Sequence, residues 1–205
     1  MRGVLAIVGM LALAVPTLAQ EVDCPRGATI QGEAPPDGNR QWCEDESGRQ
    51  HGPSMAWDAA GRPRIEAHFD AGAMQGTYRA WHENGQVAES GAYQNDRRDG
   101  TWELFYDDGK RARIQEYRGG RLHGAVREWY PNSQLRLEEH YVDGARHGAA
   151  IAFYEGGEKQ SEGGFVSGEF HGTWKGWYVD GSLRKTATFE HGRKTQEEFL
   201  PRDGE

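Results

Sequence analysis

The feature that most constrains this chain is a glycine that returns every 24 residues along most of its length. The leading glycines of this series are Gly52, Gly76, Gly100, Gly124, Gly148 and Gly172. Two further series keep the same step: Gly61, Gly85, Gly109, Ser133, Gly157 and Gly181, and Gly72, Asp96, Gly120, Gly144, Gly168 and Gly192. A period of this length is typical of repeat proteins, in which one small supersecondary unit is copied and stacked. It also argues against an enzyme, because identical copies rarely assemble one asymmetric catalytic cluster.

Each repeat is predicted to be a β-hairpin. In the copy that begins at Gly76, residues 76–82 form the first strand, Asn84-Gly85 the turn and residues 86–93 the returning strand. Asn-Gly is a strong signal for a two-residue type I′ turn, in which both central residues adopt positive φ. The sequence therefore predicts an all-β fold, an elongated solenoid-like antiparallel sheet of tandem 24-residue β-hairpin repeats with about twelve strands. Because only 36% of the residues are hydrophobic, a thick core between two layers is not expected.

Aromatic residues recur at fixed positions of the repeat. Five residues after the leading glycine stand Trp57, Trp81, Phe105, Trp129, Phe153 and Trp177, and Tyr106, Tyr130, Tyr154 and Tyr178 directly follow four of them. A two-residue turn at Asn84-Gly85 places Tyr78 opposite Gly91 and Trp81 opposite Ala88. Rings of successive repeats lie two strands apart, so they are expected to interleave with the intervening strand rather than touch.

The repeat unit resembles the MORN repeat, and more closely the bacterial variant found in antitoxin-like repeat proteins. The resemblance is carried by a leading Gly, then Tyr or Trp, then Trp or Phe followed by Tyr, and an Asn-Gly or Asp-Gly turn. It extends to the turns between repeats, which read Leu122-His123-Gly124, Arg146-His147-Gly148 and Phe170-His171-Gly172. It covers roughly residues 48–195, with Ser133 and Asp96 as departures at turn positions. The resemblance implies hairpin stacks that scaffold, bind or oligomerise.

The segments that flank the repeats have signatures of their own. Residues 1–19 predict a signal peptide, with Arg2 before an apolar run over 3–15 and small residues ahead of a cleavage site before Gln20. The run is short for a membrane span, and an uncleaved N-terminal anchor is the alternative. Residues 20–47 are expected to form an N-terminal cap, 48–192 six repeats, and 193–205 a polar C-terminal cap or tail. The chain is therefore expected to be exported, periplasmic or secreted, with no membrane span after cleavage.

The two cysteines, Cys24 and Cys43, both lie in the expected N-terminal cap. An exported chain with an even number of cysteines favours a disulfide between them. Two free thiols are the alternative. The cap is rich in Pro and Gly and is not expected to form a long regular element, although Gln41-Trp42 reads as the remnant of a strand.

The sequence does not point to catalytic, metal or cofactor chemistry. His51, His123, His147 and His171 share one repeat position, but successive copies lie roughly 9.5 Å apart, too far to surround one zinc ion. No phosphate-binding loop, calcium loop or nucleophile elbow is present. The net charge of −8 argues against nucleic acid as a partner. We expect no enzyme, no metal and no cofactor.

The aromatic rows are the feature with functional potential. They are either the core of the stack itself or, because one sheet carries rings on both faces, partly an exposed contact surface. The candidate binding residues are Tyr78, Trp102, Tyr106, Tyr130, Tyr154, Trp174 and Tyr178. The first hypothesis is a binding or scaffold protein of the cell envelope that contacts a protein or a repeating glycan. The alternatives are an antitoxin-like protein that neutralises a partner toxin, as the resemblance implies, and a structural protein that self-associates into a homo-oligomer.

Overall fold

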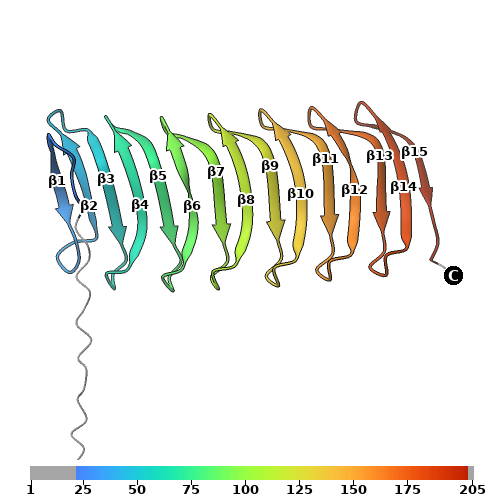
Figure 1. The fold of residues 1–205 in the computed structure, drawn as a ribbon, viewed down its shortest axis with the longest axis horizontal. Coiled ribbons are helices and arrows are strands. Elements are labelled where there is room, and N and C mark those ends of the chain that lie inside the picture. The colour runs from blue at the N-terminus through green and yellow to red at the C-terminus, as the bar shows by residue number, and fades with distance from the viewer. Residues whose placement is uncertain (1–21, 203–205) are drawn as a thin grey trace, which may run out of the picture.

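The 24-residue repeats fold as antiparallel hairpins that join edge to edge into one sheet (Figure 1). The computed structural model describes residues 22–202, so the expected signal peptide over 1–19 lies outside the described residues. Within them, 15 strands pair in sequence order. The strands are β1 (Ala28–Glu33), β2 (Arg40–Asp45), β3 (Gln50–Trp57), β4 (Pro63–Asp70), β5 (Ala73–Trp81), β6 (Val87–Gln94), β7 (Arg97–Phe105), β8 (Arg111–Arg118), β9 (Arg121–Trp129), β10 (Leu135–Val142), β11 (Ala145–Phe153), β12 (Lys159–Val166), β13 (Glu169–Trp177), β14 (Leu183–Glu190) and β15 (Arg193–Phe199).

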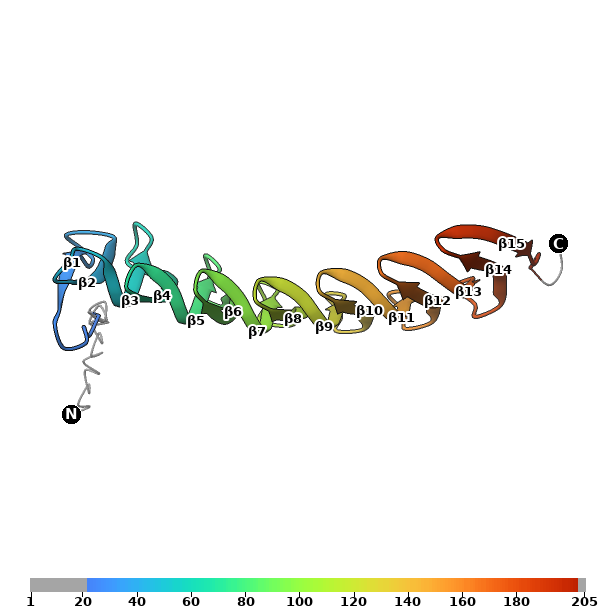
Figure 2. The same ribbon diagram turned by 90° about the horizontal axis from the view of Figure 1, so that it is seen from above.

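The predicted all-β repeat fold is confirmed. Strands β3 to β14 come from the six repeats, and each pairs with its neighbours in the chain. Seen from above, successive hairpins step along one axis as a long corrugated ribbon (Figure 2). The three additional strands lie in the flanking segments, β1 and β2 before the repeats and β15 after them.

The hairpin turns differ from the predicted type I′ geometry. Between β5 and β6, the amide of Gly85 donates to the carbonyl of His82 at 3.0 Å, and the amide of His82 donates to the carbonyl of Gln86 at 2.8 Å. Positive φ is found at Gly85 (86°) and not at Asn84. This is a type I turn followed by one left-handed residue, which makes a bulge. The side chain of Asn84 explains it, because its Oδ1 accepts a hydrogen bond from the amide of Gln86 at 3.0 Å and holds the type I turn.

The bulge changes the pairing next to the turn. Tyr78 lies opposite Gly91 as predicted, but Trp81 lies opposite Val87 rather than Ala88, because the register shifts between Ala80 and Trp81. The same shift precedes the turn in each of the six repeat hairpins. The sequence departures keep the turn geometry, since Ser133 has φ 69° and Asp96 has φ 62°.

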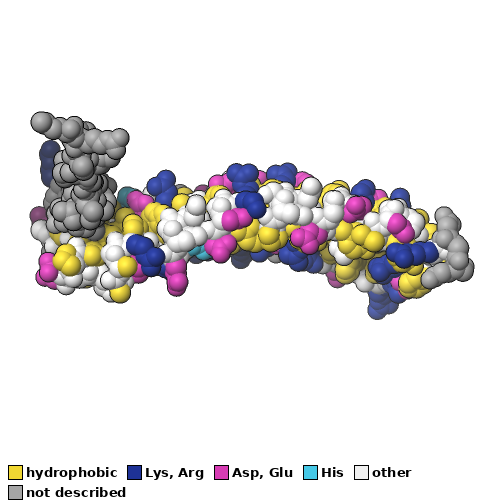
Figure 3. Space-filling view, turned by 90° about the horizontal axis from the view of Figure 1, so that it is seen from below, with side chains coloured by type: hydrophobic (Ala, Val, Ile, Leu, Met, Phe, Trp, Pro, Cys, Tyr) yellow, Lys and Arg dark blue, Asp and Glu magenta, His cyan; other side chains and the backbone are white. Residues whose placement is uncertain are grey.

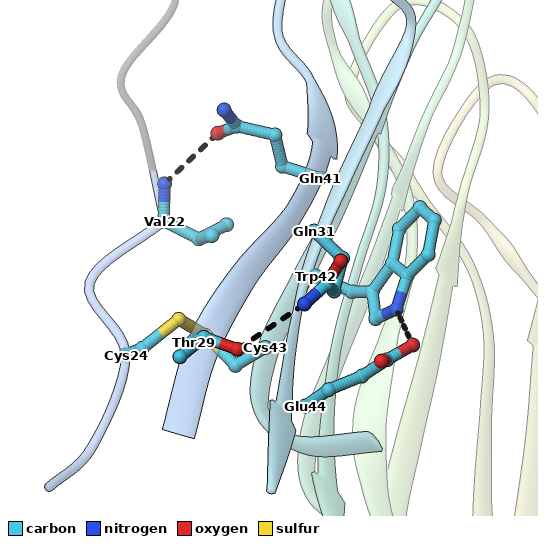
Figure 4. The surroundings of a disulfide bond; sticks show 8 residues. All are labelled: Val22, Cys24, Thr29, Gln31, Gln41, Trp42, Cys43 and Glu44. Atoms are coloured by element: carbon cyan, nitrogen blue, oxygen red, sulfur yellow. Dashed lines mark hydrogen bonds between the residues drawn. A yellow bond between two sulfur atoms is a disulfide. The ribbon is translucent and has the colours of Figure 1, made fainter. Parts of the chain in front are cut away.

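The disulfide joins the N-terminal segment to β2 (Figure 4). Cys24 and Cys43 are bonded, and Cys43 is almost fully buried. Two residues before Cys24, the amide of Val22 donates to Oε1 of Gln41 at 3.3 Å. The covalent bond thus fixes a segment that has little regular structure of its own.

Trp102 is the centre of the buried aromatic cluster of the third repeat. Its side chain is fully buried, and its ring centroid lies 5.5 Å from that of Tyr78 and 5.0 Å from that of Tyr93. The expectation that rings of successive repeats do not touch is therefore wrong at this pair. The reason is Gly91 on the intervening strand, where an added Cβ would lie 2.3 Å from Cδ2 of Trp102. The indole lies on that bare backbone and donates from Nε1 to the carbonyl of Ala92 at 3.0 Å.

The sixth repeat contains the same arrangement. Trp174 lies on Gly163, where an added Cβ would be 2.1 Å from its Cδ2, and its Nε1 donates to the carbonyl of Gly164 at 3.0 Å. A single layer of strands thus buries apolar surface by laying each indole back over the preceding strand.

We predict that Gly163→Ala lowers the free energy of unfolding by about 1–3 kcal/mol, because the new methyl group overpacks against the indole of Trp174. The matched control is Gly164→Ala in the same strand, where the nearest atom to an added Cβ is a carbonyl oxygen at 3.4 Å. Chemical denaturation of the full chain measures both. Equal destabilisation by the two variants would contradict the proposed role of the indole–glycine contact.

Candidate functional site

Adjacent repeats are connected by the tyrosines that directly follow the aromatic residue at the repeat position of Trp57. The hydroxyls of Tyr106, Tyr130 and Tyr154 donate to main-chain carbonyls one repeat further on, at 2.6, 2.9 and 2.9 Å; the acceptors are Trp129, Phe153 and Trp177. In the second repeat His82 occupies this position, and its Nε2 lies 2.9 Å from the carbonyl oxygen of Phe105. These rings are half-buried. Their polar tips are therefore engaged by the chain itself.

In the third repeat an arginine side chain covers the tryptophan ring. The guanidinium of Arg98 lies 4.0 Å from the centroid of Trp102 and pairs with Glu89 at 2.6 Å. Burial, with the charge of Glu89, raises the pKa of the neighbouring Tyr78 hydroxyl. Trp102 and Tyr78, both candidate contact residues, thus belong to a closed cluster in which Trp102 has no exposed surface.

The sixth repeat leaves the equivalent region open. Phe170 stands at the position of Arg98, is 41% exposed, and meets Trp174 edge-on with ring centroids 4.9 Å apart. Phe189 stacks on Phe170 at 5.1 Å. Beside these rings lies a hollow of about 440 Å³, which we call the C-terminal hollow; it is lined by Gln160, Ser161, Phe170, Trp174, Lys175, Gly176, Arg184, Lys185, Ala187, Phe189, Lys194 and Glu197.

Small residues on neighbouring strands create the C-terminal hollow. Ser161 lies opposite Gly176, and Gly176 lies opposite Lys185, so the three form one row across β12, β13 and β14. In the third repeat the equivalent row carries larger side chains throughout: Glu89, Leu104, Arg113 and Glu128. Side-chain volume in this row therefore decides whether the face is filled or hollow.

The charge at the C-terminal hollow is positive although the chain as a whole is acidic. Lys194 forms an ion pair with Glu197, and Nζ of Lys185 lies 4.0 Å from the same carboxylate. The hydrogen bond from Lys194, assisted by both positive charges, lowers the pKa of Glu197. Arg184 adds a third cation, whose Nε is buried without a hydrogen-bond partner in residues 22–202. Figure 3 shows basic side chains next to hydrophobic ones toward this end of the molecule.

Of the seven candidate contact residues, only Trp174 lines the C-terminal hollow. Tyr178 lies at the following turn, with the guanidinium of Arg202 4.7 Å from its ring centroid. Sequence reasoning missed Phe170, Gly176, Lys185 and Lys194. A signal was present only at Gly176, because three of the other five repeats carry Ala at that position, whereas the position of Phe170 varies among Gln, Met, Arg and Leu.

The histidine row contacts turn residues. Nδ1 of His51 lies 3.1 Å from Asp70, and Nδ1 of His123 lies 3.3 Å from Asp143. Residues 22–202 contain no group of three or more His, Cys, Asp or Glu side chains arranged to hold a metal ion. Within the same residues, no helix is both long and apolar enough to cross a bilayer.

Comparisons with known proteins identify the repeat. A family model described as "MORN repeat variant" matches three consecutive segments, 74–95, 98–118 and 122–143. No curated protein matches the chain. Among solved structures, one titled "Crystal structure of GtfA/B complex bound to UDP and GlcNAc" is 14% identical, with a TM-score of 0.24; the match covers 73% of this chain and 26% of that one. This structural likeness is too low to support an argument.

We predict that Tyr154→Phe lowers the free energy of unfolding by about 1 kcal/mol, because it removes a hydrogen bond that joins two repeats. Tyr178→Phe is the matched control at the same repeat position, since no hydrogen bond is made by that hydroxyl within the described part of the chain. Urea denaturation followed by fluorescence measures both. A loss of stability in the control alone would contradict the assigned role.

Proposed function

We propose that this MORN-type repeat protein is a non-catalytic binding scaffold of the cell envelope that contacts a protein or a glycan through its C-terminal hollow. MORN repeats are generally binding or scaffold units. The disulfide between Cys24 and Cys43 is compatible with export. The expected leader over 1–19 supports the same location.

The observation that carries the proposal is the contrast between two equivalent tryptophans. Trp102 is sealed by Arg98, Tyr78 and Tyr93, so it serves stability. Trp174 borders a hollow next to the exposed ring of Phe170. A concave surface lined by aromatic side chains with a few polar groups is the usual form of a ligand site. In this proposal Trp174 contacts the ligand. The hydrogen bonds of Tyr106, Tyr130 and Tyr154 hold adjacent repeats together.

Phe170→Arg tests the site, because it places an arginine at the repeat position from which Arg98 covers Trp102. We expect the variant to lose capture of envelope components by the immobilised full chain, because the guanidinium covers the indole of Trp174. Leu122→Arg is the matched control at the same repeat position in another repeat, and it should capture as the unmodified chain does. Capture is compared by quantitative mass spectrometry and glycan analysis of the eluates. Unchanged capture by Phe170→Arg would remove the site from the proposal.

Self-association is a second candidate, and the first strand favours it. Beyond β1 no further strand pairs within residues 22–202. This edge carries one charged residue, Glu33, and an Ile30 that is 45% exposed. Strand β15 at the opposite edge is instead rich in charge, which blunts edge pairing.

If two copies pair through β1, Ile30→Lys should shift the chain from dimer to monomer in sedimentation experiments, since a charged edge resists strand addition. Phe199→Lys on β15 serves as the control and should leave the dimer intact. A chain that sediments as a monomer at high concentration rules out this candidate.

A further inference from the structure

We infer that the C-terminal hollow binds an anionic sugar unit, that is, a pyranose ring bearing a carboxylate within an acidic glycan. This inference rests on the proposed binding function and names the ligand class for the same site. It follows from three features of the hollow: its aromatic walls, its unbalanced positive charge and the pairing of the strands beneath it.

The walls suit a flat ring of modest size. A volume of about 440 Å³ falls within the range of roughly 300–1,000 Å³ that small-molecule sites occupy. Trp174, Phe170 and Phe189 supply apolar ring surface, on which the C–H face of a pyranose can pack. Gln160 and Ser161 bring an amide and a hydroxyl to the same hollow. These groups can exchange hydrogen bonds with sugar hydroxyls.

The excess positive charge of the lining favours an anionic ligand. Arg184, Lys185 and Lys194 contribute three positive charges against the single carboxylate of Glu197. The fourth cation of the lining, Lys175, has Glu162 at 3.9 Å. Arg184 brings a guanidinium to the lining, and a carboxylate is the acceptor that a guanidinium binds best. A neutral sugar would leave this excess charge without a partner.

The sheet beneath the hollow disfavours an extended peptide. Strands β12, β13 and β14 are each paired on both sides, so their main-chain groups are already used by the sheet. A peptide that binds by strand addition needs a free edge, and such an edge is absent from the floor of this site. A sugar needs none, because its hydroxyls and its carboxylate bond to side chains.

The test compares two trisaccharides that differ in charge. We expect calorimetry with the full chain to show α-1,4-linked trigalacturonate binding at least about tenfold more tightly than neutral α-1,4-linked galactotriose. Gly176→Leu should abolish this binding, because leucine fills the hollow; Leu104 occupies the equivalent position in the third repeat. Ala80→Leu, at the same position in the second repeat, is the control and should bind normally. Circular dichroism and thermal melting confirm that both variants fold.

A second pair of variants separates charge from shape. Lys185→Gln combined with Lys194→Gln should lower the affinity for trigalacturonate and leave that for galactotriose unchanged. Equal binding of the two trisaccharides, or unchanged binding by Gly176→Leu, would overturn the inference. So would tighter binding of hexaglutamate, which would assign the site to acidic peptides. If neither saccharide binds while capture remains sensitive to Phe170→Arg, the ligand class is wrong and the proposed function stands; if both fail, neither stands.

Discussion

An indole lying on a glycine of the preceding strand is the contact around which the third and sixth repeats pack. A single layer of strands has no second layer against which to bury its apolar side chains. Trp102 and Trp174 solve the problem within the layer, because Gly91 and Gly163 let each ring lie directly on the backbone. Each of these two indole N–H groups also donates to a carbonyl, so burial leaves neither indole nitrogen unpaired. Strand pairing alone would leave both faces of the sheet exposed to water.

The repeats are joined at both ends of their strands as well as along them. At one end tyrosine hydroxyls reach the carbonyls of the next repeat. At the other end turn amides donate to the preceding repeat, as Gly120 does to the carbonyl of Arg98 at 2.9 Å. Each repeat therefore depends on its neighbours, which is the general behaviour of repeat proteins. Equivalent contacts also make the repeats alike, so function is best sought where one repeat departs from the others.

The sixth repeat departs in this way. Phe170 stands at the position of the arginine that covers Trp102 in the third repeat, and Ser161 and Gly176 stand where that row has Glu89 and Leu104. The result is an open aromatic surface bordered by Arg184, Lys185 and Lys194. In the proposed function, the contact site therefore lies where these positions carry less side-chain volume than in the third repeat.

The period, the hairpins and the ring positions were determined by sequence alone, because left-handed turns and strand alternation are local properties. The even number of cysteines favoured a disulfide, and the structure shows it between Cys24 and Cys43. Turn type was not determined by sequence alone, since Asn84 favours type I through its side chain where the Asn-Gly pair suggests type I′. The contact between Tyr78 and Trp102, and the hollow beside Trp174, were decided only by the tertiary structure. Both depend on which side chains meet across neighbouring strands of different repeats. The candidate site depends on side chains that are distant in the sequence, because strand pairing brings Ser161 and Lys185 into one row.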